Sequence, residues 1–227
     1  MSSLNHLKFI VRLNLRMPFH RFPHDFVYWD KVQNHEKIKN DLMSIIKNKN
    51  FNNTEKQGLE DAHTDFIPGM TVSDSDLLHP ELTGEIWRIL DEVMKNIFND
   101  DNSFSPKFKK SEINNIWCTK YDKNGEFELH CHSYGQVTHK EYGEYIPSFS
   151  MIYILNDDNE RNSTVFTKLD AKIPFIQQSE YHFNTSDIDD IGEGTLLVFP
   201  STLYHRVKRV KVPNRITIAI NIISSCD

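Results

Sequence analysis

The feature that most constrains the fold of this chain is a change in hydrophobic period near residue 110. Beyond that point, apolar residues recur at every second position in short segments separated by Gly and Asn/Asp clusters, a pattern typical of strands. About eight strands at this spacing predict a barrel or a double-sheet jelly roll. The segments span residues 113–121, 127–132, 149–155, 164–169, 181–184, 195–199, 205–212 and 215–223.

The first half of the chain has a mixed pattern. One helix is predicted over 34–48, where four apolar residues share a face, and a second begins at Pro80. In that second helix, apolar residues recur at three- and four-residue steps as far as Phe98. Residues 7–15 alternate as a strand would, whereas 50–80 are rich in Asn, Asp, Thr, Gly and Pro and predict an irregular connection.

These patterns together predict an α+β fold that is mainly β, with N-terminal helices covering one sheet. The length of 227 residues fits a single domain over 1–227. Within it, we expect residues 1–110 to supply helices and edge strands as support. Residues 111–227 are expected to form the β core that carries the site.

Composition excludes several classes of protein. A hydrophobic content of 38% is enough for a core and excludes wholesale disorder. With 26 basic and 32 acidic residues the net charge is −6, which argues against general nucleic-acid binding. No apolar run approaches the roughly 20 residues that cross a bilayer, and the first residues do not form a signal peptide, so no membrane partner is expected. Three scattered cysteines indicate a reducing, cytoplasmic location rather than a disulfide framework.

Three histidines are candidate metal ligands. His130 and His132 lie two residues apart on a predicted strand, so both imidazoles would face the same side. Such a pair suits a borderline divalent metal, although surface histidines at this spacing also occur by chance. His205 follows the buried segment 194–200 and is predicted at the mouth of a strand.

The last predicted strand has two unlike faces. Its even positions from Ile216 to Ile222 are all isoleucine, and its odd positions include Arg215 and Thr217. In one interpretation the isoleucines point inward and the polar residues meet solvent. In the other, the isoleucines pack beneath the helices, and Arg215 and Thr217 line a cavity where they could hold a small dicarboxylate. The pattern alone leaves both open.

Taken in order, His130, His205, Arg215 ten residues later and Thr217 resemble the 2-oxoglutarate/Fe(II)-dependent oxygenase superfamily, and most nearly its prolyl-4-hydroxylase-like branch. The resemblance extends over about residues 112–223 and implies a double-stranded β-helix. Segment 121–132, YDKNGEFELHCH, resembles that branch's tyrosine, glycine and H-x-D strand. Segments SMIYILN (150–156), STVF (163–166) and GTLLVF (194–199) are similar to other strands of the family.

The chain departs from the family at His132, where the family has a carboxylate. Three explanations are open: His132 is the third metal ligand, a downstream acid such as Glu141 takes that place, or water completes a site made by His130 and His205. The position two residues after His130 favours His132. Exchanging a carboxylate for a neutral imidazole raises the net charge of the site by one, which would alter metal choice and oxygen reactivity.

The resemblance implies an Fe(II)- and 2-oxoglutarate-dependent dioxygenase that hydroxylates a peptidyl or amino-acid side chain. Arg215 and Thr217 would hold the far carboxylate of 2-oxoglutarate, and Tyr121 would hydrogen-bond to the same end. Dioxygen would be the second cosubstrate, and the substrate would be a peptide, a protein or an amino acid, by analogy with the branch.

Two rival interpretations remain. Cupins share the fold and use a paired HxH, and segment 194–205 matches their second motif except for Thr202 in place of glycine. However, the cupin glutamate is missing, and that scheme gives Arg215 and Thr217 no role. The second rival is a β-helix that has lost catalysis and serves as a binding or assembly module, as the missing carboxylate would allow.

Overall fold

The structure, a computed structural model, describes residues 19–22, 25–48, 52–53, 59–64, 75–98, 108–132, 137–139, 143–145, 148–157, 163–169, 180–211 and 213–226. Strands dominate these residues and two helices accompany them, so the mainly β class with N-terminal helices is confirmed. Neither helix of this described part has the length and apolar character that crossing a membrane would require.

The elements follow one another in an order that places both helices before the main run of strands. They are β1 (Phe19–Phe22), β2 (Asp25–Lys31), α2 (His35–Ile46), β3 (Asn52–Asn53), β4 (Leu59–Thr64), the 3-10 turn η2 (Ser75–Leu77), α3 (Pro80–Phe98), β5 (Phe108–His130), β6 (Val137–His139), β7 (Gly143–Tyr145), β8 (Phe149–Asn156), β9 (Thr164–Leu169), β10 (Glu180–Asn184), the 3-10 turn η3 (Thr185–Asp187), β11 (Thr195–Pro200), β12 (Tyr204–Val207) and β13 (Arg215–Cys226).

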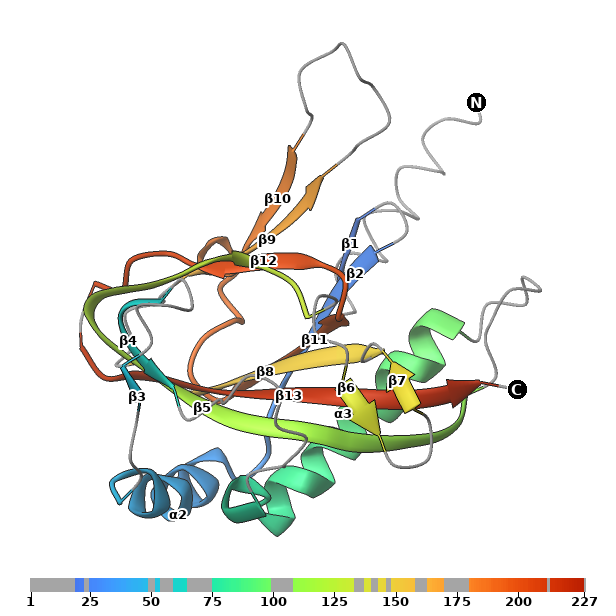
Figure 1. Ribbon diagram of the computed structural model, residues 1–227, viewed down its shortest axis with the longest axis horizontal. Coiled ribbons are helices and arrows are strands. Elements are labelled where there is room, and N and C mark those ends of the chain that lie inside the picture. The colour runs from blue at the N-terminus through green and yellow to red at the C-terminus, as the bar shows by residue number, and fades with distance from the viewer. Residues whose placement is uncertain are drawn as a thin grey trace, which may run out of the picture.

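The main sheet folds over on itself through its longest strand. Its order is β1-β2-β11-β8-β13-β5-β12-β9-β10, with antiparallel neighbours, and β4 pairs with β5 as well. The first part of β5 pairs with β13 and its last part with β12. Figure 1 shows β5 running through the layer next to the helices, turning, and returning in the opposite layer beside β12. This arrangement fits the jelly roll that the sequence predicted.

The turn of β5 lies at Asn124, which has a left-handed φ of 71° that asparagine tolerates better than most residues. The Asn124 N–H donates to the Val210 carbonyl at 2.9 Å, and the Val210 N–H donates to the Gly125 carbonyl at 3.0 Å. Because the bend keeps these hydrogen bonds, the chain stays extended on both sides of it. The two strands predicted over 113–121 and 127–132 are therefore one strand with a bend.

The apolar core lies between the helices and the near layer of the sheet. The isoleucines of β13 at positions 216, 218, 220 and 222 are all buried there, together with the apolar faces of α2 and α3. Figure 1 shows both helices beneath β5, β8 and β13. This packing decides between the two interpretations of β13: the isoleucines lie under the helices, and the opposite face is buried as well rather than open to solvent. The helix residues in this core are Ile38, Leu42, Ile46, Leu82, Ile86, Ile89, Leu90 and Val93.

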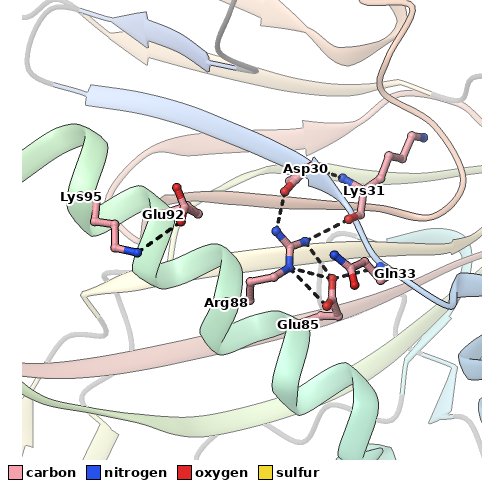
Figure 2. Close-up of polar contacts among 7 residues, drawn as sticks. All are labelled: Asp30, Lys31, Gln33, Glu85, Arg88, Glu92 and Lys95. Carbon is pink, nitrogen blue, oxygen red and sulfur yellow. Dashed lines mark hydrogen bonds and ion pairs between the residues drawn. The ribbon is translucent and has the colours of Figure 1, made fainter.

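A polar cluster fastens α3 to the end of β2 (Figure 2). The Arg88 guanidinium donates to Asp30 Oδ2 at 2.8 Å, to the Lys31 carbonyl at 3.1 Å and to Glu85 Oε2 at 2.8 Å. Glu85 in turn accepts from the Gln33 N–H at 3.0 Å. The hydrogen bond with Glu85 is the main cause that raises the pKa of Arg88. One planar cation thus joins a helix side chain to both a side chain and a backbone carbonyl of the strand.

The sequence-based description was wrong in three places. Residues 50–80 include β3 and β4, and β4 forms a ladder with β5 although its composition is polar. The strand predicted over 205–212 ends at Val207. The hairpin of β1 and β2, whose inner strand joins β11, was not predicted. Residues 7–15 lie outside the described part of the chain.

We expect Ile220→Ala to lower the free energy of unfolding by about 2–5 kcal/mol, because it leaves a cavity under the helices. Ile220→Val removes one methylene group and should cost about 0.5–1.5 kcal/mol. The matched control is Lys95→Ala on the exposed side of α3, which should change stability by less than about 0.5 kcal/mol. Urea denaturation measures all three, and an Ile220→Ala loss no larger than the control would contradict the packing described above.

Candidate metal and ligand site

The fold brings the three predicted histidines together at the end of β5 and the start of β12. One ring nitrogen from each of His130, His132 and His205 lies within 4.8 Å of the others. The centroids of the His130 and His205 rings are 4.2 Å apart, and that of His132 lies 5.5 Å and 5.1 Å from them. His130 and His205 are direct partners in the ladder between the two strands, which explains why residues 75 positions apart meet.

Two of the rings are oriented by the backbone. His130 Nδ1 donates to the Glu128 carbonyl at 2.8 Å, and His205 Nδ1 donates to the Leu203 carbonyl at 3.1 Å. A carbonyl can only accept, so each Nδ1 carries the proton. Nε2 therefore keeps its lone pair and is the nitrogen left to bind a metal.

His132 lies in the turn beyond the end of β5, so strand alternation alone does not place it. The backbone N–H of His132 donates to the Ser201 carbonyl at 2.9 Å, and this hydrogen bond holds the turn against the end of β11. Its Nδ1 lies 2.7 Å from Asn221 Oδ1 and 2.7 Å from Ser150 Oγ. The Trp117 ring packs against it, with centroids 5.5 Å apart. Side chains thus orient the His132 ring, whereas backbone carbonyls orient the rings of His130 and His205.

The surroundings keep all three rings neutral. Burial lowers the pKa of His132 to about 4, assisted by the nearby His130. Burial also lowers the pKa of His130, and it lowers the pKa of His205 well below its usual value. Neutral imidazole is the form that binds a metal, and it suits iron, zinc, copper or nickel. The donor set therefore fits a transition-metal ion.

Arg215 lies at the other end of the same interior. Its side chain has no solvent exposure, and its Nη2 donates to Thr164 Oγ1 at 3.0 Å. Its Nε lies 3.7 Å from Oδ1 of Asp157, which is also buried. Nε and Nη1 have no hydrogen-bond acceptor within the part of the chain described. Because buried donors are nearly always satisfied, these two nitrogen atoms indicate that an acceptor is missing, and a carboxylate is a suitable acceptor for Nη1.

Tyr121 and Thr217 lie beside this guanidinium. Tyr121 is the ladder partner of Arg215, and its ring centroid lies 5.7 Å from Arg215 Cζ. Burial raises the pKa of Tyr121 to about 12, against the lowering effects of Arg215 and of its hydrogen bond with Thr217. The phenol therefore keeps its proton at neutral pH and can donate to a ligand.

One face of β13 connects the two ends of the site. Arg215, Thr217, Ala219 and Asn221 alternate with the isoleucines and are all buried. Arg215 lies at the end near Tyr121, and Asn221 contacts His132 at the other end. Between these two ends, Ala219 contributes only a methyl group. Glu141, the alternative third ligand, lies outside the described residues.

A second cluster of metal-binding residue types is already satisfied by protein contacts. His35, Glu36 and Glu193 bring ligand atoms within 4.8 Å of one another. His35 uses Nδ1 for the Tyr153 hydroxyl at 2.6 Å and Nε2 for Glu193 at 3.3 Å, and Lys39 also binds Glu193. Because both ring nitrogens are engaged, this cluster serves to join α2 to the turn before β11.

Sequence reasoning missed several residues of the interior. Thr164 was quoted only for its resemblance to a family segment, and Asp157 follows β8 in a position that no pattern marks. The alternation of the last strand does place Asn221 on the same face as Arg215, but its contact with His132 could not be predicted. Ser150 is the second residue of β8, a strand that is buried along its whole length, where its hydroxyl needs a neighbouring partner that the sequence does not reveal.

No protein-family model and no curated protein matches this chain, whereas solved structures match it in fold. A Pseudomonas putida prolyl-4-hydroxylase matches with a TM-score of 0.51 and 10% identity, over 88% of this chain and 92% of that one. A Trichoplax adhaerens prolyl hydroxylase, solved in complex with a hypoxia inducible factor oxygen degradation domain peptide fragment, matches with a TM-score of 0.53 and 11% identity, over 98% and 94%. HygX from Streptomyces hygroscopicus, with nickel, 2-oxoglutarate and hygromycin B bound, matches with a TM-score of 0.51 and 11% identity, over 93% and 84%. At these identities, the likeness shows that the fold is shared.

The lowered histidine pKa values predict how the stability of the metal-free protein depends on pH. An unfolded histidine titrates near 6.5, whereas folded His132 titrates at about 4. Between these values the unfolded chain binds more protons, so stability is complete above about pH 6.5 and declines as the pH falls toward about 4. We expect His132→Gln to make this decline shallower in urea denaturation with a chelator present. His182→Gln, at an exposed position on β10, is the control and should keep the slope of the parent. Equal slopes for the parent and His132→Gln would contradict the pKa shift.

Proposed function

We propose that this protein is an Fe(II)- and 2-oxoglutarate-dependent oxygenase built on a double-stranded β-helix, with a three-histidine metal site. The observation that carries the proposal is that three neutral imidazoles and a buried guanidinium with two unsatisfied nitrogen atoms line one interior. A metal alone would not require the guanidinium, and a carboxylate alone would not require the histidines. A chelating dicarboxylate requires both.

At the metal end, His130, His132 and His205 would hold the ion through their Nε2 atoms. Three neutral ligands leave further coordination positions open for a chelating keto acid and for dioxygen. Bound iron, with 2-oxoglutarate and dioxygen, supplies the oxidising power that hydroxylates a substrate C–H bond. The chain fixes the three rings before the metal arrives, because each Nδ1 is already hydrogen-bonded.

At the other end, Arg215 would bind the far carboxylate of 2-oxoglutarate through Nη1, while Thr164 accepts from Nη2 and Asp157 lies 3.7 Å from Nε. Tyr121 and Thr217 would complete the contacts, as the family resemblance suggests. The nearby Asp157 adds one negative charge beside Arg215. The two positive charges of the metal and the one on Arg215 balance the dicarboxylate together with Asp157. The negative charge that the family places on the metal thus lies beside the arginine in this chain.

We further propose that the substrate is a peptidyl or amino-acid side chain, and that the chain belongs to the prolyl-4-hydroxylase-like branch. The segments that resemble this branch support the assignment, as does the fold shared with prolyl hydroxylases, one of them in complex with a peptide. HygX, which shares the fold, has the small molecule hygromycin B bound. A substrate screen should therefore include free amino acids and small metabolites as well as peptides.

The two rivals make different use of the interior. A cupin-type enzyme has no role for the unsatisfied N–H groups of Arg215. An inactive binding module would have no reason to hold three imidazoles neutral with one ring nitrogen of each close to the others. The interior therefore favours the oxygenase over both.

We expect the Fe(II)-loaded protein to convert 2-oxoglutarate to succinate with consumption of dioxygen, faster in the presence of its substrate. His205→Ala should abolish this conversion, because a single change removes one of the convergent ligands, and it should also abolish Mn(II) binding. His182→Gln is the matched control and should behave as the parent does. Succinate analysis with a peptide and amino-acid panel measures the outcome. Full activity in His205→Ala, or none in the parent with any panel member, would overturn the proposed function.

We expect Arg215→Ala to weaken 2-oxoglutarate binding by about thirty-fold to several thousand-fold, since a desolvated cation–carboxylate contact contributes roughly 2–5 kcal/mol. Arg215→Lys keeps the charge but loses the planar fork, and should give an intermediate loss. Asp157→Asn should instead strengthen binding, because the amide no longer competes for the guanidinium. Calorimetric titration into Mn(II)-loaded protein measures each affinity. Unchanged affinity in Arg215→Ala would refute the assignment of this residue.

A further inference from the structure

A row of polar side chains crosses four neighbouring strands and ends at His132. Asn221 of β13 is the ladder partner of Asn115 on β5 and of Ser150 on β8, and Ser201 follows β11 directly. All four are buried, at 6%, 5%, 0% and 1% exposure respectively. Ser150 Oγ lies 2.8 Å from Ser201 Oγ and donates to Asn221 Oδ1 at 2.8 Å. Three strands and the residue that follows a fourth thus each place a polar side chain in the interior. Apolar side chains would pack there without needing hydrogen-bond partners.

The hydrogen bonds of this row have a definite direction. Asn114 Nδ2 donates to Asn115 Oδ1 at 2.7 Å, and Asn221 Nδ2 donates to the same oxygen at 3.2 Å. The Asn221 amide is therefore oriented with its oxygen toward His132, where Oδ1 lies 2.7 Å from Nδ1. An amide oxygen can only accept, so His132 Nδ1 must carry the proton.

The opposite tautomer would disrupt the whole row. An unprotonated Nδ1 would face the lone pairs of Asn221 Oδ1, so the Asn221 amide would have to turn over. Its oxygen would then face Asn115 Oδ1, and Asn115 would have to turn as well. That second turn would give up the donor from Asn114 at 2.7 Å. Because buried groups lose most when left unpaired, three amides in series hold one tautomer of one imidazole.

We propose that Asn221 and Ser150, oriented by Asn115, are positioning residues that hold His132 as its Nδ1–H tautomer, so that Nε2 faces His130 and His205. The purpose assigned to that tautomer, ligation of the metal by His132, rests on the proposed function. The tautomer itself does not, because it is a property of the metal-free chain. In this protein an amide–hydroxyl row replaces the backbone carbonyls that orient the other two rings.

The tautomer can be read directly in the metal-free, 15N-labelled protein. Two-bond 1H–15N correlation spectra near neutral pH distinguish protonated from unprotonated ring nitrogens, and His132→Gln assigns the signals of His132. We expect Nδ1–H in the parent. Asn221→Leu, which keeps a similar volume but has no acceptor, should give a mixture with the Nε2–H form, since the Ser150 hydroxyl can donate or accept. Ser150→Ala should give a smaller change, and Asn221→Asp should retain Nδ1–H because a carboxylate accepts the same proton.

Metal affinity is the second measurement, with Co(II) as the probe followed by its absorbance. Loss of a residue that orients a metal-binding imidazole typically costs about 10- to 100-fold in affinity, and we expect this for Asn221→Leu. Asn221→Asp should bind Co(II) at least as well as the parent. A merely space-filling role would instead predict unchanged affinity for Asn221→Leu, which keeps a similar volume. Ser111→Ala is the matched control, because Ser111 hydrogen-bonds to Ser224 between the same two strands at 2.8 Å, away from the histidines. It should change neither the tautomer nor the affinity.

The outcomes separate this inference from the proposed function. An Nε2–H tautomer in the parent, or an Nδ1–H tautomer unaffected in both Asn221→Leu and Ser150→Ala, would overturn the positioning role whether or not metal binds. A tautomer that responds as expected in a parent that binds no Co(II) or Fe(II) would support the positioning role and overturn the metal site. If Asn221→Leu does not fold, the other two variants still give different expectations, because Ser150→Ala should change the tautomer population and Asn221→Asp should not.

Discussion

The arrangement of this molecule depends on the burial of both faces of one strand, β13. Its isoleucine face packs under α2 and α3, and its other face closes the space between the two layers of the sheet. A strand with only one buried face could have carried Arg215 and Asn221 into solvent, where each would be satisfied by water. With both faces buried, every polar side chain on β13 must find a partner within the protein or in a ligand.

That requirement accounts for the electrostatics of the site. Burial keeps the three imidazoles neutral, keeps the Tyr121 phenol protonated, and leaves two donors of Arg215 without an acceptor. These are consequences of one physical condition, the burial of these side chains between the layers. In such a medium a charge on a ligand interacts more strongly with Arg215 than it would at the surface. Asp157 moderates this effect, because it places a negative charge beside the guanidinium in advance.

The sequence predicted the parts of the fold whose periodicity is strong, namely α2, α3 and most of the strands after residue 110. It could not predict β4, because the sequence of that strand is largely polar and its pairing with β5 leaves no local pattern. The two-faced pattern of β13 left its orientation undecided until the position of the helices was known. For the site, spacing and resemblance predicted His130, His132, His205, Arg215, Thr217 and Tyr121. The partners that orient them, such as Asn221 and Ser150, depend on ladder register, which a single sequence does not contain.

The single long strand β5 gives this protein two kinds of sensitivity to insertion and deletion. Before the bend at Asn124, alternate residues serve both sides: Ile116 and Cys118 face the helices, whereas Trp117 packs against His132. A shift of one residue there would exchange the two sets and damage the core and the site together. Beyond the bend, β5 has left the helix-side core, and its main task is to bring His130 opposite His205. A one-residue deletion in that part would turn His130 away from His205 while the helix-packed layer remained intact. The candidate metal site could therefore be lost in evolution without loss of the fold.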